Sequence, residues 1–110
     1  MQTPVYRYKS VSVEPGKKAV LVNINASPGS VIDIEHIGHS FFDNEVEFKL
    51  VFDGKVWLRW DHQLGQSSPG PMYELPEPLT VTKSLRLVVV NKSKDTRLYS
   101  GSMDGVLHKI

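Results

Sequence analysis

Residues 45–60 read E-V-E-F-K-L-V-F-D-G-K-V-W-L-R-W, and this stretch decides the fold. Two runs rich in β-branched and aromatic residues flank Asp53 and Gly54, and an Asp-Gly step between alternating runs is a strong short-range signal for a β-hairpin. Glycine supplies the left-handed backbone conformation that such a turn needs. The stretch therefore predicts two antiparallel strands joined at Asp53-Gly54, with Gly54 at positive φ.

Two registers are compatible with this hairpin. A two-residue loop sets Phe48 opposite Arg59 and mixes charged and apolar side chains on both faces. A three-residue loop that begins at Phe52 makes one face wholly apolar, so we expect this register, with Trp57 on the outward face across from Lys49. The expected inward pairs are Val46 with Trp60, Phe48 with Leu58, and Leu50 with Val56.

The rest of the chain repeats the same signals. Alternating apolar and polar residues at 18–26 and 31–38 predict two further strands, each bounded by turn residues. The apolar run at 85–91 predicts a central strand buried on both sides. Shorter strand signals occur at residues 5–13, 79–82, 97–100 and 106–110, which gives eight or nine strands in all.

The predicted fold class is all-β. No run of ten or more residues has helical spacing, and short strands with turn signals at regular spacing are typical of two packed antiparallel sheets. We expect residues 1–110 to form a single antiparallel β-sandwich that is jelly-roll-like. The alternative is an immunoglobulin-like sandwich, which normally pairs a core tryptophan with two cysteines, and this chain has no cysteine.

Composition excludes several classes of partner. The net charge of +1 offers no electrostatic footprint for nucleic acid, and no stretch approaches the roughly 20 apolar residues that span a bilayer.

The charges are unevenly distributed along the sequence. Residues 31–61 hold seven acids against three bases, and residues 83–110 hold six bases against two acids, so the two segments carry about −4 and +4. One interpretation is that an acidic surface of one copy meets a basic surface of a neighbour; the other is ordinary solvated charge.

A long connection interrupts the strand pattern at residues 61–78. It contains four of the seven prolines, and loops of this length inside a compact domain are uncommon and often functional. Proline rigidity lowers the entropic cost of ordering the segment against a neighbour. We expect an arm that makes an intermolecular contact in a homo-oligomer, with a trimer favoured. Its apolar anchors are Leu64, Met72, Tyr73 and Leu75. The alternative is that these four side chains fold back and cap the open end of their own sandwich.

The candidate metal ligands are His36, His39, His62 and His108. His36 and His39 are three residues apart, so on one strand they point to opposite faces unless the strand ends at Gly38. A three-histidine site with an acid such as Glu35 is the arrangement of jelly-roll metalloenzymes, but the glycine-rich histidine motif of that superfamily is missing. We therefore expect no metal and no cofactor.

Catalytic motifs are also missing. The chain has no G-x-S-x-G nucleophile elbow and no glycine-rich phosphate loop, and the absence of cysteine excludes a thiolate nucleophile. The prediction is a protein that is not an enzyme.

Three stretches carry a resemblance to a known class of proteins. Residues 11–22 read V-S-V-E-P-G-K-K-A-V-L-V, residues 29–37 read G-S-V-I-D-I-E-H-I and residues 47–55 read E-F-K-L-V-F-D-G-K. The chain resembles the small β-sandwich virion structural proteins of tailed phages and related viruses. The resemblance implies a non-enzymatic virion component, either a capsid decoration or a fibre-type subunit, that contacts itself and capsid or other virion proteins.

A second hypothesis is a carbohydrate-binding β-sandwich module. An outward tryptophan on a sheet face is a platform on which a sugar ring can stack. In this interpretation Trp57 stacks a glycan, and Tyr73 and His62 from the long connection complete the site.

Overall fold

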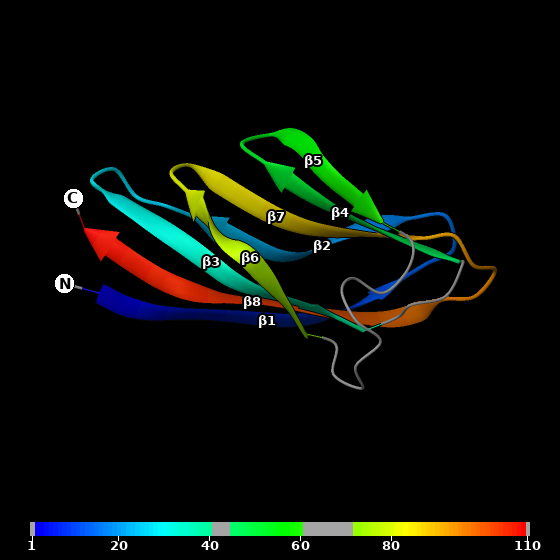
Figure 1. The fold of residues 1–110 in the computed structure, drawn as a ribbon. Coiled ribbons are helices and arrows are strands. Elements are labelled where there is room, and N and C mark those ends of the chain that lie inside the picture. Colours follow the sequence, from blue (N-terminus) through cyan, green and yellow to red (C-terminus); the bar gives the residue numbers. More distant parts are fainter. Residues whose placement is uncertain (1, 41–44, 61–71, 110) are drawn as a thin grey trace.

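The computed structural model describes residues 2–40, 45–60 and 72–109, and at 57–60 and 72–76 it describes the backbone alone (Figure 1). No helix that is long and apolar enough to cross a membrane occurs in this part of the chain. The described residues form eight strands: β1 (Gln2–Val13), β2 (Lys18–Asn25), β3 (Ser30–His39), β4 (Val46–Phe52), β5 (Lys55–Trp60), β6 (Met72–Val81), β7 (Ser84–Asn91) and β8 (Arg97–Lys109).

The strands form two four-stranded antiparallel sheets. Sheet A has the order β1-β8-β3-β6, and sheet B has the order β2-β7-β4-β5. The pairs are nested around the central hairpin: β4 pairs with β5, β3 with β6, β2 with β7 and β1 with β8. This nesting is the jelly-roll order, so the predicted jelly-roll sandwich is confirmed and the immunoglobulin-like alternative is wrong.

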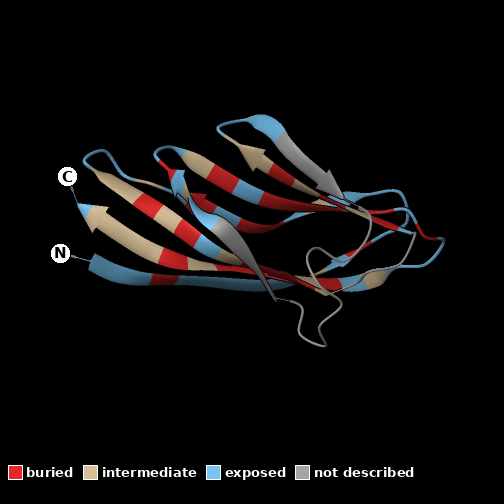
Figure 2. Cartoon of the chain, in the orientation of Figure 1, coloured by how far each residue is buried: buried red, intermediate tan, exposed pale blue. Residues whose placement is uncertain are grey.

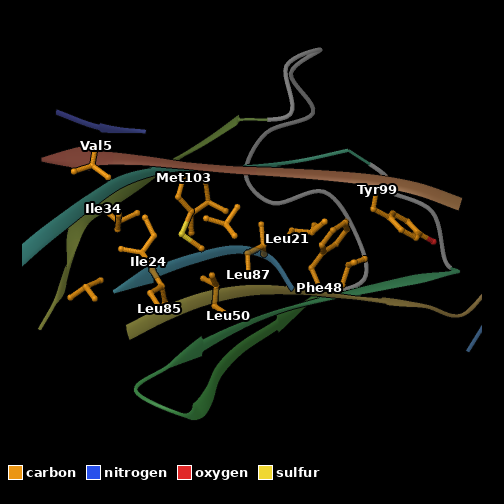
Figure 3. Packing of buried hydrophobic residues seen from close by; sticks show 14 of the residues in the cluster. Val5, Leu21, Ile24, Ile34, Phe48, Leu50, Leu85, Leu87, Tyr99 and Met103 are labelled. Atoms are coloured by element: carbon orange, nitrogen blue, oxygen red, sulfur yellow. The ribbon is translucent and has the colours of Figure 1, made fainter. Parts of the chain in front are cut away.

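Apolar side chains from both sheets fill the space between them (Figure 3). Buried residues are interspersed with more exposed ones along the strands of both sheets (Figure 2). The alternation in β4 places Val46, Phe48 and Leu50 fully inside, as predicted, because successive side chains of a strand point to opposite faces. The Phe48 ring packs edge-on against Tyr99 of sheet A, with 6.5 Å between the ring centroids. Inward residues of the central strands thus join the two sheets.

The central hairpin ends in a two-residue turn, not in the predicted three-residue loop. Phe52 pairs with Lys55, and Asp53 and Gly54 have φ of 50° and 84°, which confirms the positive φ predicted for Gly54. Asp53 also holds the turn against β7. Its backbone N–H donates to the Ser84 carbonyl and its carboxylate accepts from the Ser84 N–H, each at 3.0 Å.

A bulge in β5 then shifts the register by one residue. The pairs are Phe48 with Trp60, Leu50 with Leu58 and Val51 with Val56. The predicted pairing is therefore wrong, and Trp57 is the extra residue of the bulge. Val56, predicted to face the core, is 46% exposed because it lies between the turn and the bulge, where it pairs with an outward residue of β4.

The segment predicted as the end of a loop is in part a strand. Residues 72–78 belong to β6, the edge strand of sheet A, whereas 61–71 lie outside the described residues. The register with β3 passes from Ile34–Leu79 to His36–Glu74, so residues 75–78 lie within the shift. Both prolines of this interval are compatible with a strand because a bulge on an edge strand needs no N–H from them.

The C-terminal strand is continuous, although two short strands with a connection at 101–105 were predicted. Gly101 and Gly105 belong to the predicted connection, and both lie where β8 passes very close to other parts of the chain. A Cβ on Gly105 would lie 2.9 Å from Cα of Ile34 and closer still to the carbonyl oxygen of Asp33; one on Gly101 would lie 2.7 Å from Leu87. Glycine is required by this close approach, not by a turn.

We predict that Gly105→Ala lowers the free energy of unfolding by about 1–3 kcal/mol, because the added methyl group meets backbone atoms of β3 that can move only with their strand. Urea unfolding measures the change. Ser12→Ala, at an exposed position of β1, is the control and should change stability by less than about 0.5 kcal/mol. Equal unfolding midpoints for Gly105→Ala and the wild type would contradict the close approach.

The side chain of Asn91, at the end of β7, is fully buried and fully hydrogen-bonded. Its Nδ2 group donates to the carbonyls of Val13 and Asp95, each at 2.8 Å. Its Oδ1 accepts from the backbone N–H of Ser93 at 2.8 Å and from the Ser93 hydroxyl at 2.6 Å. The amide thus joins the end of β1 to the connection between β7 and β8.

The backbone of Asn91 makes two further bonds to the turn between β1 and β2. Its N–H donates to the Lys17 carbonyl at 2.9 Å, and its carbonyl accepts from the Gly16 N–H at 2.8 Å. Asn91 therefore contacts two of the connections that pass from one sheet to the other, β1–β2 and β7–β8.

Asn91→Asp should lower the free energy of unfolding by about 3 kcal/mol. The substitution keeps the shape but turns a buried carboxylate oxygen toward the carbonyls of Val13 and Asp95, where two N–H donors were. Urea unfolding of Asn91→Asp and of Asn23→Asp, an exposed position on β2, gives the comparison. Equal stability of the two variants would show that the Asn91 bonds do not hold the fold.

Candidate functional site on the two outer sheet faces

The outer face of sheet A carries acidic and aromatic side chains. Register and burial place Asp33, Glu35 and Asp104 outward, and no outward position of β1, β3 or β8 has a lysine or arginine. We call this surface the acidic face. It is defined by Tyr6, Tyr8, Asp33, Glu35, His36, Leu98, Asp104 and His108.

Two histidine–aspartate pairs lie on the acidic face. His36 Nδ1 is 2.6 Å from Asp104 Oδ1, and His108 Nε2 is 3.0 Å from Asp33 Oδ2; all four side chains are about one third exposed. In the second pair Asp33 also accepts a hydrogen bond of 2.7 Å from the Thr80 hydroxyl. The carboxylate therefore lies between the hydroxyl and the imidazole. A histidine that activates a hydroxyl nucleophile contacts the hydroxyl itself, so these three groups are not arranged for nucleophilic catalysis.

A bulge in β3 places Glu35 beside the first pair. Ile34 pairs with Gly105 and His36 with Asp104, which are consecutive residues of β8, so Glu35 is the extra residue. Two residues of β3 then stand opposite one residue of β8, and Glu35 and His36 share the outer face. One ligand atom from each of Glu35, His36 and Asp104 lies within 4.8 Å of the others.

The remaining histidines do not complete a three-histidine site within the described residues. β3 continues through Gly38, so His39 points inward, where it is buried with its ring centroid 4.2 Å from that of Phe48. His36 and His39 therefore lie on opposite faces, as the alternation predicted. His62 lies outside the described residues.

Three large apolar side chains are exposed on the acidic face. Tyr6, Tyr8 and Leu98 are 58%, 60% and 61% exposed. The Tyr8 hydroxyl is 3.0 Å from the Ser10 hydroxyl, a neighbour on the same face. Sequence reasoning missed this pair of tyrosines, although the Tyr-Arg-Tyr alternation at the start of β1 places both rings on one side of a strand.

The outer face of sheet B is basic. It carries four cationic side chains and one carboxylate, that of Glu47. The Glu47 carboxylate lies 3.6 Å from the Lys49 amine and 3.4 Å from the Lys92 amine. We call this surface the basic face. It is defined by Lys18, Val20, Glu47, Lys49, Val51, Val56, Arg86, Val88 and Lys92.

A shallow depression of about 370 Å³ lies on the basic face. Four valines line it, and three cations surround them. Val20 and Val56 are the most exposed of these valines, at 39% and 46%. The depression is lined by Lys18, Ala19, Val20, Lys49, Val51, Val56, Arg86 and Val88.

The charges separate by face and not by sequence segment. Residues 31–61 contribute β3 to sheet A and β4 and β5 to sheet B, and residues 83–110 likewise contribute one strand to each sheet. The acidic face has three carboxylates and no lysine or arginine at its outward strand positions, whereas the basic face has four cations and one carboxylate.

The structure gives only the backbone position of most of the other predicted site residues. Leu64 lies outside the described residues. Met72, Tyr73 and Leu75 lie in β6 of sheet A and Trp57 lies in β5 of sheet B, all four at positions where the backbone alone is described. The predicted arm contact and the predicted stacking by Trp57 and Tyr73 therefore stay predictions.

Comparison with known proteins gives likenesses of fold. No protein-family model and no curated protein matches the chain. A periplasmic inhibitor of g-type lysozyme from Aeromonas hydrophila is 8% identical, with a TM-score of 0.46 over 96% of this chain and 86% of that one. A de novo designed double-stranded β-helix is 22% identical, with a TM-score of 0.37 over 89% and 97%. The VP2 subviral particle of infectious bursal disease virus is 13% identical, with a TM-score of 0.38 over 94% of this chain and 32% of that one.

Proposed function

We propose that this chain is a non-enzymatic structural subunit, of the virion decoration or fibre class, that associates with itself through its two outer faces. Two analogies support the virion class: the jelly-roll strand order, and the three sequence stretches that resemble virion structural proteins. The observation that carries self-association comes from the surfaces of the chain itself.

The five exposed large apolar side chains of the described residues all lie on the two outer faces. Three belong to the acidic face and two to the basic face, and they are Tyr6, Tyr8, Leu98, Val20 and Val56. Exposed apolar groups on a monomer mark interaction surfaces when they gather on one patch. Opposite charge on the two patches favours contact between unlike faces over contact between like faces.

The two faces lie on opposite sides of the sandwich, since each is the outer surface of one sheet (Figure 1). A contact between the acidic face of one copy and the basic face of the next is heterologous, and it leaves a free face at each end. Such contacts repeat along an open stack, which suits a fibre-type subunit. The trimer expected from the sequence requires a different contact, through the arm of residues 61–78.

Charge reversal tests this proposal. We expect the basic-face variant Lys18→Glu, Arg86→Glu to weaken self-association by at least about tenfold, because two acidic faces then meet. The acidic-face variant Asp33→Lys, Glu35→Lys should do the same. Sedimentation velocity over a range of concentrations and salt gives the measurement, and salt should weaken the wild-type association.

Mixing the two variants is the decisive experiment. The reversed basic face of one variant is complementary to the reversed acidic face of the other, so an equimolar mixture should recover association. The matched control is Lys17→Glu, Lys94→Glu, two exposed lysines outside both faces, which should associate as the wild type does. A wild type that is monomeric at high concentration, or a concentration-independent trimer, would overturn the stacking.

One observation favours a second candidate, glycan binding. Tyr6 and Tyr8 are exposed on the same side of β1, about 7 Å apart along the strand, and they present two aromatic surfaces beside the Ser10 hydroxyl. Glycan-array binding that is lost in Tyr6→Ala, Tyr8→Ala and retained by both charge-reversal variants would favour this function. Loss in Trp57→Ala instead would support the site expected from the sequence.

A further inference from the structure

The bulge in β3 creates a cluster that the alternation of the strand does not predict. Glu35 and His36 are neighbours in sequence and would point to opposite faces of a regular strand. Because the register with β8 skips Glu35, both side chains lie on the outer face, with Asp104 directly opposite His36. Among the described residues, this is the one group of three or more acids and histidines whose ligand atoms converge within 4.8 Å.

The size of the cluster is close to that of a metal site. Donor atoms at about 2.1 Å from a tetrahedral Zn²⁺ are about 3.4 Å apart. His36 Nδ1 and Asp104 Oδ1 are 2.6 Å apart, so a metal that replaces the shared proton between them needs them to separate by less than 1 Å. Glu35 is exposed and its side chain can rotate toward them.

The donor set selects a class of metal. One imidazole nitrogen with two carboxylates suits borderline divalent ions such as Zn²⁺ and Co²⁺, whereas Mg²⁺ and Ca²⁺ prefer oxygen alone. His36 and Asp104 are about one third exposed, so water can occupy the remaining coordination positions.

We propose that Glu35, His36 and Asp104 bind one divalent transition-metal ion of the Zn²⁺ class on the outer face of sheet A. All three ligands come from one chain, so the site needs no second copy, although it lies on the acidic face that the proposed stack covers. It also reverses the expectation drawn from the sequence, which rested on strand parity and on the missing glycine-rich histidine motif.

The molecule contains its own matched control. His108 and Asp33 form a second histidine–aspartate pair on the same face with the same exposure, but the group beside Asp33 is the Thr80 hydroxyl instead of a third carboxylate. A metal that binds any exposed histidine–aspartate pair would use both pairs. A metal that requires the bulge would use only the pair beside Glu35.

The test is calorimetric titration of the full chain, treated with chelator, with Zn²⁺ in about 0.5 M NaCl, which screens contacts between exposed charges of different copies. We expect one Zn²⁺ per chain and no measurable Mg²⁺ binding. Glu35→Gln, His36→Ala and Asp104→Asn should each weaken Zn²⁺ binding by at least about tenfold, whereas His108→Ala should leave it unchanged. Circular dichroism and urea midpoints verify that each variant is folded.

Titration with Co²⁺ supplies a second readout, because visible absorption of the ion reports nitrogen and oxygen coordination directly. The absorption should appear with the wild type and His108→Ala and should be absent with His36→Ala. Absence of Zn²⁺ binding to the wild type, equal loss in His36→Ala and His108→Ala, or unchanged binding in Glu35→Gln would each overturn the proposal. None of these outcomes depends on whether the chain associates with itself.

Discussion

The rest of the structure depends on the buried amide of Asn91. In a jelly roll the chain passes repeatedly between two sheets, and here the connections β1–β2 and β7–β8 do so at the same end. Asn91 bonds to both: its side chain holds Val13, Ser93 and Asp95, and its backbone holds the turn at residues 16–17. A buried amide with every donor and acceptor in use permits one arrangement of these connections, because any other would leave polar groups without partners in an apolar interior.

Bulges determine which residues share a face. In β2 the register skips Leu21, so Leu21 and Val22 both point inward and both are buried. In β3 a bulge has the opposite effect: the register skips Glu35, and Glu35 and His36 both point outward. One backbone irregularity therefore adds apolar contact to the core in sheet B and concentrates polar donors on the surface of sheet A.

The sequence predicts the fold well and the candidate site poorly, for one physical reason. Period-2 alternation identified β2, β3 and β4 because it depends only on which residues are apolar, and Val46, Phe48 and Leu50 are buried as expected. A bulge changes which face of the sheet the neighbouring residues occupy, and the hydrophobic pattern of the sequence does not reveal where a bulge lies. The inward position predicted for Val56 was wrong for this reason, and parity gave no hint that Glu35 lies beside His36. A connection was predicted between residues 100 and 106, but Gly101 and Gly105 mark close packing inside a continuous strand.

The place of β8 in sheet A has a consequence for the order of folding. β8 lies between β1 and β3, and it pairs Gln2 with His108, residues from opposite ends of the described chain. Of the eight described strands, β8 is synthesised last, and it is the one strand among them that pairs with β1. β1 therefore stays unpaired until all the other described strands have been synthesised. Contacts so distant in sequence slow folding, and they expose unpaired strand edges while the chain is incomplete. β1 contains proline and cationic residues, such as Pro4, Arg7 and Lys9. Such residues disfavour pairing of the unpaired strand with other nascent chains during that interval.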